Sequence, residues 1–207
     1  MNGFLFALLA VQLAGIGARD QILVAQMTAK QGLRPALLII ALLTSTIAAI
    51  LAGWAAAEAP LELGRSPRLA FAALALGLGG IESLLFSKPK PPKEPTQSLA
   101  AAAIVLFAQQ ITDSGRLLIF AIAVATNSSL AVLGGVLGGA ASLVIGWLGG
   151  AQLLGNVGML RLARFVSGAL LLGTAIGLML VVLGDIDNLG PVLATLRDNL
   201  GRKLDGM

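Results

Sequence analysis

The stretch PALLIIALLTSTIAAILAGWAAA, from Pro35 to Ala57, decides the fold class because it holds no charged residue. About 20 helical residues cross the hydrocarbon core of a bilayer, so this stretch is long enough to span one. Three more long apolar runs follow: Leu69 to Phe86 with the single charge of Glu82, Leu130 to Leu154, and Phe165 to Gly184. The runs are continuous and do not alternate apolar with polar residues, which disfavours a transmembrane β-barrel. The sequence predicts an all-α membrane protein.

The overall composition agrees with this class and excludes several kinds of chemistry. Of 207 residues, 57% are hydrophobic and only 12% are charged, against about 25% charged in a typical soluble domain. The chain has no Cys, no His and no Tyr, which excludes disulfides, imidazole and thiolate metal ligands, and Ser–His or Cys–His nucleophiles. Any bound ion must therefore be held by oxygen atoms, as Ca²⁺, Mg²⁺ and Mn²⁺ are. The basic residues form no patch and aromatic residues are few, so we expect no nucleic-acid partner.

The first residues allow two interpretations. The segment from Met1 to Ala18 resembles a signal peptide that is cleaved after Ala18. Its start has no Lys or Arg, however, and Arg19 follows the apolar core instead of preceding it. We favour a retained first helix and keep cleavage as the alternative.

A Pro- and Lys-rich segment, SKPKPPKEPTQS, divides the chain near its middle. Its composition disfavours helix and predicts a linker in water. We divide the chain into a first three-helix repeat (1–86), this linker (87–98), a second three-helix repeat (99–185) and a C-terminal tail (186–207). The tail carries Leu residues on one face of a helix from Asn188 to Leu204, which predicts a helix lying in the membrane interface.

Matching residues in the two halves indicate an internal duplication. At an offset of 93 residues, Gly-Trp, Arg-Leu-Ala and Gly recur: Gly53-Trp54 with Gly146-Trp147, Arg68-Leu69-Ala70 with Arg161-Leu162-Ala163, and Gly80 with Gly173. Each half also has a ribbon of small residues spaced by four: Ala41, Ser45, Ala49, Gly53 and Ala57, then Gly134, Gly138, Ser142, Gly146 and Gly150. Such ribbons let transmembrane helices approach closely, so we expect both ribbons to pack against other helices.

Each half begins with an apolar segment that is too short to span a membrane. The segments Phe4–Gly17 and Leu99–Ile111 run into polar breaks at Gly17–Gln21 and Thr112–Arg116, and each break leads into more apolar residues. We therefore predict six transmembrane helices as two inverted three-helix repeats, with the first and fourth helices broken. Broken helices at corresponding positions of inverted repeats are a sequence sign of a transporter's central site.

The basic residues predict the orientation. With the N-terminus outside, eight fall in inner loops (Arg19, Lys30, Arg34, Lys88, Lys90, Lys93, Arg161 and Arg164) and three in outer loops (Arg65, Arg68 and Arg116). The C-terminal tail adds Arg197, Arg202 and Lys203 to the outer side, which makes eight against six. Inner loops of membrane proteins are enriched in Lys and Arg. We predict N-out and C-out in a bacterial inner membrane, with the linker in the cytoplasm.

This arrangement resembles the transmembrane protein 165 / Gdt-one family over nearly the whole chain, from about Phe4 to Leu183. The family carries the motif E-x-G-D-[KR]-[ST], usually followed by Gln, once in each half. The first copy here, Gly15–Gln21, keeps Gly17, Arg19 and Gln21 but has neither family carboxylate, and Asp20 stands at the hydroxyl position. The second copy, Gln110–Arg116, keeps the acid as Asp113, with Gln110 in place of the Glu.

The resemblance implies a membrane-embedded exchanger of Mn²⁺ or Ca²⁺ for protons, with no enzymatic activity and no bound cofactor. The implied acidic metal residue is Asp113, with the first-half break opposite it. If the segment is helical, Gln109 and Gln110 lie four and three residues before Asp113 on roughly the same face, so we predict them as further metal ligands. An acid at membrane depth is costly and is commonly functional, and amide oxygens suit hard cations. The partners would be the lipid bilayer, a divalent cation and the proton, and homo-oligomerisation stays open.

Other interpretations of the same residues stay open. Asp113 equally fits a surface salt bridge with Arg116 at the outer interface. We expect Arg19 and Asp20 to form a solvated turn, Glu82 to be a surface acid near the cytoplasm, and Gln12 to bond between helices. A same-fold carrier of a monovalent cation or small polar metabolite, and a non-transporting membrane scaffold, remain alternatives to the exchanger.

Overall fold

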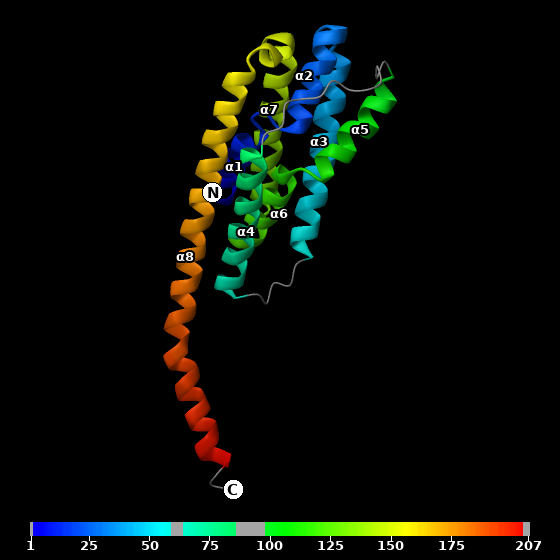
Figure 1. The fold of residues 1–207 in the computed structure, drawn as a ribbon. Coiled ribbons are helices and arrows are strands. Elements are labelled where there is room, and N and C mark those ends of the chain that lie inside the picture. The colour runs from blue at the N-terminus through cyan, green and yellow to red at the C-terminus, as the bar shows by residue number, and fades with distance from the viewer. Residues whose placement is uncertain (1, 59–63, 86–97, 205–207) are drawn as a thin grey trace.

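The computed structural model describes residues 2–58, 64–85 and 98–204, and these residues form helices and turns without any strand (Figure 1). In chain order the helices are α1 (Asn2–Gly15), α2 (Arg19–Gln31), α3 (Pro35–Ala57), α4 (Arg65–Leu84), α5 (Leu99–Ile111), α6 (Ser114–Thr126), α7 (Leu130–Gly155) and α8 (Val157–Leu204). The predicted all-α class is confirmed. The linker at residues 87–98 lies outside the described residues except for Ser98.

Four helices are long and apolar enough to cross a membrane: α3, α4, α7 and the Gly158–Gly184 part of α8. The bent pair α1–α2 makes a fifth span if it is counted as one. At 13 residues each, α5 and α6 are too short to cross alone, because a helix rises about 1.5 Å per residue. The predicted count of six is therefore not reached by length and composition.

Both predicted helix breaks are present, slightly before the expected positions. The chain bends by 56° between α1 and α2, where Gly17 has a φ of 67°, a left-handed conformation that favours glycine. The N–H of Gly17 donates to Oε1 of Gln21 at 2.5 Å. A side chain from the first turn of α2 therefore accepts from a backbone N–H just before the start of that helix. Between α5 and α6 only Thr112 and Asp113 are non-helical, and the carboxylate of Asp113 caps α6.

The second small-residue ribbon packs against α1 and α2 along its length, as predicted. All five of its residues are buried. A methyl group on Gly138 would lie 2.5 Å from the carbonyl oxygen of Leu8, and one on Gly146 would lie 2.7 Å from that of Gln21. The helices therefore approach backbone to backbone, which only residues without a side chain permit at these points.

The first ribbon serves the same purpose on α3 over part of its length. Ala41, Ser45 and Ala49 are buried, whereas Ala57 at the end of the ribbon is exposed. The helices that contact α3 are α5, α6 and α7, and to a smaller extent α2. The broken pair of each half thus packs on the long helix of the other half, α1–α2 on α7 and α5–α6 on α3.

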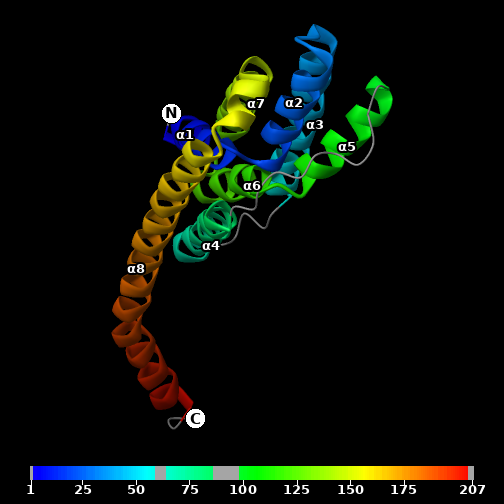
Figure 2. The same cartoon turned by 45° about the horizontal axis from the view of Figure 1, so that its top comes forward.

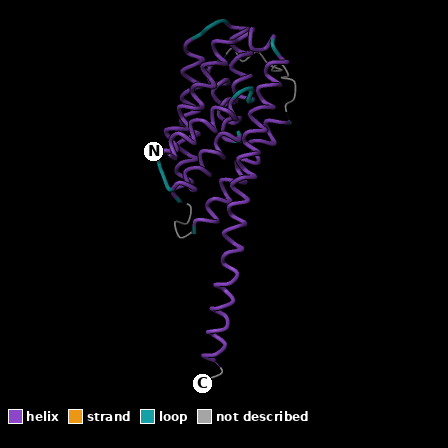
Figure 3. The backbone as a smooth tube through the Cα atoms, turned by 90° about the vertical axis from the view of Figure 1, so that its left-hand side faces the viewer, coloured by secondary structure: helices purple, strands orange, loops and turns teal. Residues whose placement is uncertain are grey.

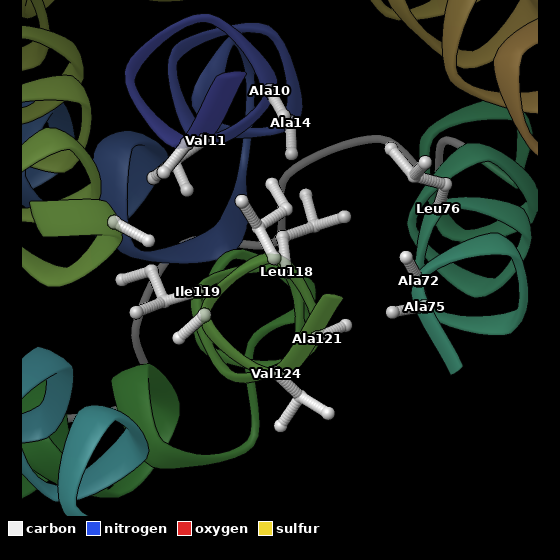
Figure 4. Close-up of a cluster of buried hydrophobic side chains, with 14 of the residues drawn as sticks. Ala10, Val11, Ala14, Ala72, Ala75, Leu76, Leu118, Ile119, Ala121 and Val124 are labelled. Atoms are coloured by element: carbon white, nitrogen blue, oxygen red, sulfur yellow. The ribbon is translucent and has the colours of Figure 1, made fainter. Parts of the chain in front are cut away.

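The largest hydrophobic cluster surrounds α6. Leu118 and Ile119 are fully buried. Figure 4 shows Ile119 on the side of α6 away from α4, whereas Leu118 lies between α1 and α4. A second cluster joins α2, α3, α5 and α7 around Val24, Leu37 and Leu106. Since α6 begins at one of the two breaks, its burial fixes the position of that break inside the protein.

The last helix is longer than predicted. A single helix, α8, runs from Val157 to Leu204, whereas the sequence predicted a span that ends near Gly184 and a separate tail helix. The tail up to Leu204 therefore continues α8, and Figures 2 and 3 show it projecting beyond the other helices. Its placement in a membrane interface stays a prediction.

Candidate functional site

The two helix breaks are held in the interior by one serine from each half. At the first break, Oγ of Ser142 donates to the carbonyl of Gly15 at 2.8 Å, and Nε2 of Gln21 donates to the carbonyl of Ser142 at 2.8 Å. At the second break, Nη2 of Arg116 donates to Oγ of Ser45 at 2.7 Å. Each serine lies on the long helix of the opposite half, so the breaks are tied to the partner half and not to their own.

These contacts bear on the register of the predicted duplication near the breaks. Ser45 and Ser142 each bond to the break of the opposite half and are 97 residues apart, four more than the predicted offset of 93 between Trp54 and Trp147. Four residues are about one helical turn. The small-residue ribbons tolerate this shift because they repeat every four residues.

A cavity of about 1290 Å³ lies beside the breaks. It is lined from α2, α3, α4, α5, α6 and α8, and most of its lining is apolar. Its charged lining residues come from both halves: Arg19, Glu82, Asp113, Arg116 and Arg164. A cavity of this kind, with a few polar groups on apolar walls, is the usual form of a small-molecule site.

Asp113 lies where the sequence analysis expected it, at the second break and on the cavity wall. It is half-buried, and its Oδ2 accepts a hydrogen bond from the N–H of Gly115 at 3.0 Å. The alternative role, an exposed salt bridge with Arg116, is wrong: Arg116 is only 5% exposed and bonds to Ser45 instead. Asp113 is both a helix cap and a cavity carboxylate.

The two predicted amide ligands, Gln109 and Gln110, point to different places in the structure. Gln109 lines the cavity, and its Oε1 is buried without a hydrogen-bond partner. Gln110 is fully buried and donates through Nε2 to the carbonyl of Ala41 at 3.3 Å, facing α3 and not the cavity lining. Because α5 ends at Ile111, regular helical spacing does not relate the two glutamines to Asp113.

Asp20 is a buried acid that the sequence analysis placed in a solvated turn. It is 7% exposed and its Oδ1 accepts from the N–H of Gln21 at 2.7 Å. It lies within electrostatic range of Arg116 and near the amide of Gln110, both from the second break. Its neighbour Arg19 is exposed and lines the cavity. The available signal was an acid in a short break between two apolar segments, because an acid is costly at membrane depth.

Arg164 is a structural cation that the sequence analysis counted as a loop residue. It is buried in α8, and its guanidinium donates to four carbonyls at the ends of α1 and α4: Nη2 to Glu82 at 3.0 Å, Nε to Ser83 at 3.3 Å, and Nη1 to Ile16 at 3.3 Å and Ala14 at 3.5 Å. A cation at helix C-termini satisfies carbonyls that lack partners within the helix. Arg164 thereby holds the first break against the end of α4.

Glu82 and three arginines were predicted at the surface or in loops, and the structure places them elsewhere. Glu82, expected at the surface, is half-buried and lines the cavity. Arg19 and Arg116 lie beside the breaks and Arg164 lies inside α8, so none is an ordinary loop residue. Lys30, Arg65, Arg68 and Arg161 lie in helices as well, so the count of basic residues in loops does not test the orientation, which stays a prediction.

The cavity lining holds three guanidiniums and two carboxylates. Within the part of the chain that the structure describes, no group of three or more Asp, Glu, His or Cys residues is arranged to hold a metal ion. No protein-family model, curated protein or solved structure matches the chain.

Proposed function

We propose that the protein is a membrane carrier whose substrate binds in the cavity beside the two helix breaks. The observation that carries this proposal is the meeting of buried charged residues from both halves at broken helices. Ionisable groups at membrane depth are costly and mark substrate or ion pathways. Helix breaks near the middle of the membrane are the usual place for a secondary transporter's site.

The helix contacts support two inverted repeats as part of this proposal. Exchanging the halves converts the α1–α7 contact into α5–α3, the α2–α7 contact into α6–α3, and the α1–α6 contact into α5–α2, and all of these contacts occur. If α5 and α6 together count as one broken span, each half crosses the membrane three times. An odd number of crossings makes the halves face opposite ways.

The substrate that the geometry favours is a small polar organic solute, exchanged or co-transported with protons. The cavity is far larger than a dehydrated ion, and its three guanidiniums would repel a divalent cation. Asp113 and Glu82 supply carboxylates that can bind a positively charged group of the solute or a proton. Placement in a bacterial inner membrane, N-out and C-out, belongs to the same proposal.

A second candidate is the exchange of Mn²⁺ or Ca²⁺ for protons, which the resemblance to the transmembrane protein 165 / Gdt-one family implies. The observation that favours it is the set of oxygens near Asp113. The unpartnered Oε1 of Gln109 lines the same cavity, and the carboxylates of Asp20 and Glu82 lie within electrostatic range. Carboxylate and amide oxygens are the ligands that hard cations take.

Flux in proteoliposomes tests these candidates together. The purified protein is reconstituted, and uptake of Mn²⁺, Ca²⁺, Na⁺, L-leucine, L-lysine and L-glutamate is followed with and without an imposed proton gradient. We expect gradient-driven uptake of an organic solute that is lost in the Asp113→Asn variant. Flux of Mn²⁺ or Ca²⁺ alone would establish the second candidate instead. Absence of all flux, with no proton movement, would refute the carrier and leave a non-transporting scaffold.

A further inference from the structure

Arg116 is a buried guanidinium with spare hydrogen-bonding capacity. It lies in the first turn of α6, is 5% exposed, and lines the cavity. Its Nη2 donates to Oγ of Ser45 at 2.7 Å, while its Nε is buried and has no hydrogen-bond partner. Within the described chain it forms no ion pair with a carboxylate.

Such an arrangement points to a ligand. A guanidinium is always charged and presents five donors in a planar fork, so burying it without an anion is costly. The hydroxyl of Ser45 orients the fork but does not neutralise it. Asp20 and Asp113 interact with Arg116 electrostatically through space but do not pair with it directly. The guanidinium of Arg116 is therefore held in place while some of its hydrogen-bond donors have no partner.

The same cavity presents negative charge from two other elements. Asp113 comes from the break before α6, and Glu82 comes from the end of α4. The Oδ2 atom of Asp113 is used by the N–H of Gly115, which leaves Oδ1 to accept from a ligand. Between these charged groups the wall is apolar and includes Leu78, Ile81 and Phe120.

We propose that Arg116 binds the carboxylate of a zwitterionic solute whose ammonium group is held by Asp113 and Glu82, and whose apolar side chain lies on the wall of the cavity. The inference rests on the proposed carrier function and names its substrate class, an α-amino acid with an apolar side chain. The guanidinium fork matches a carboxylate in bidentate fashion. A solute with only one charge would leave the opposite group of the cavity without a partner.

Binding measurements on the purified full chain in detergent test this assignment. Isothermal titration compares L-leucine with isopentylamine, which is leucine without its carboxylate, and with 4-methylpentanoate, which is leucine without its amino group. We expect the wild type to bind leucine at least about tenfold more tightly than either analogue, because each charged contact adds affinity.

The variants assign each charged group to one end of the ligand. Arg116→Gln should weaken leucine binding to the level of isopentylamine and leave isopentylamine binding unchanged. Asp113→Asn should weaken leucine binding to the level of 4-methylpentanoate. Arg161→Gln, which changes an exposed arginine outside the cavity lining, is the matched control and should bind like the wild type.

Two further variants keep the test decisive if Arg116→Gln does not fold. Arg116→Lys keeps the charge but loses the fork, and Ser45→Ala frees the fork from its orienting hydroxyl. Both should weaken binding of leucine more than binding of isopentylamine. Failure of the wild type to bind leucine, or equal weakening of leucine and isopentylamine by these variants, would overturn the assignment.

The result of the binding test can be distinguished from the result of the flux test of the carrier. Leucine binding that depends on Arg116, without flux in proteoliposomes, would support the binding site and refute transport. Flux of another solute, together with leucine binding that is absent or independent of Arg116, would support the carrier and overturn the assignment of Arg116.

Discussion

At the scale of single residues, Asp113 combines two tasks that one pair of substitutions separates. Its carboxylate caps α6, and the same side chain lines the cavity. Asn is as good an N-cap as Asp, whereas Ala is a poor one and costs about 1 kcal/mol. A variant that keeps the cap but removes the charge therefore isolates the role in transport.

We expect Asp113→Asn to unfold at nearly the wild-type temperature and to lose proton-driven flux. Asp113→Ala should also lose flux. In addition, it should unfold at a lower temperature, because loss of the cap reduces the free energy of unfolding by about 1 kcal/mol. Thermal unfolding in detergent and flux in proteoliposomes measure the two effects. Full flux in Asp113→Asn would show that the carboxylate is only a helix cap.

In contrast to Asp113, Arg164 has a structural role, because its hydrogen bonds all go to the backbone. Arg164→Met keeps much of the side-chain volume but leaves the carbonyls of Glu82, Ser83 and Ile16 without their donor. We expect a loss of about 2–4 kcal/mol in unfolding free energy, since buried carbonyls would be unsatisfied. Arg161→Met, on the exposed side of the same helix, is the control. Equal stability of the two variants would contradict the capping role.

At the scale of elements, the fold depends on close contact between α7 and the broken pair α1–α2. The contact is made by glycines and a serine spaced by four on α7. A methyl group at such a position meets backbone atoms, which cannot rotate away as a side chain can. Small changes in volume should therefore have large effects on this helix.

Gly138→Ala should destabilise the protein by about 1–3 kcal/mol, the usual cost of overpacking. Gly177→Ala on α8 is the matched control, because nothing lies within 4 Å of the added methyl group. Alanine is the better helix former, so the control should be neutral or slightly stabilising. Unfolding of both variants under the same detergent conditions gives the comparison. Equal stability of the variants would remove the proposed role of the α7 ribbon.

At the scale of the whole molecule, the predicted orientation in the membrane rests on the excess of basic residues assigned to the inner side. The natural chain has no cysteine, so a single introduced cysteine reports its side of the membrane without background. Gln97 belongs to the predicted cytoplasmic linker, whereas Glu58 directly follows α3 at the predicted outer side.

In intact cells, we expect an impermeant thiol reagent to label Glu58→Cys and not Gln97→Cys. Permeabilised cells should show labelling of both variants, which controls for accessibility. Labelling of Gln97→Cys alone from outside would reverse the topology. Labelling of both from outside would contradict the assignment of these segments to opposite sides.

Some features of the fold were predicted correctly from the sequence and others were not. The uncharged run from Pro35 to Ala57 predicted a helix correctly, because the bilayer requirement acts on each segment alone. The breaks near Gly17 and Asp113 were also found, because glycine and capping side chains act on their own turn of chain. The long α8 was divided wrongly, because Gly184 and the polar residues after it were taken as a helix end.

The sequence by itself determined the helical membrane class, the two breaks and the small-residue ribbons, all of which depend on neighbours a few positions away. Only the tertiary structure decided which charges are buried and which face the cavity. Asp20 and Arg116 are far apart in sequence, and their burial arises from the packing of each broken pair on the opposite half. Gln109 and Gln110 are adjacent, yet one lines the cavity and the other bonds to α3, because successive helical residues point about 100° apart. Local pattern fixes the elements, and long-range packing fixes the site.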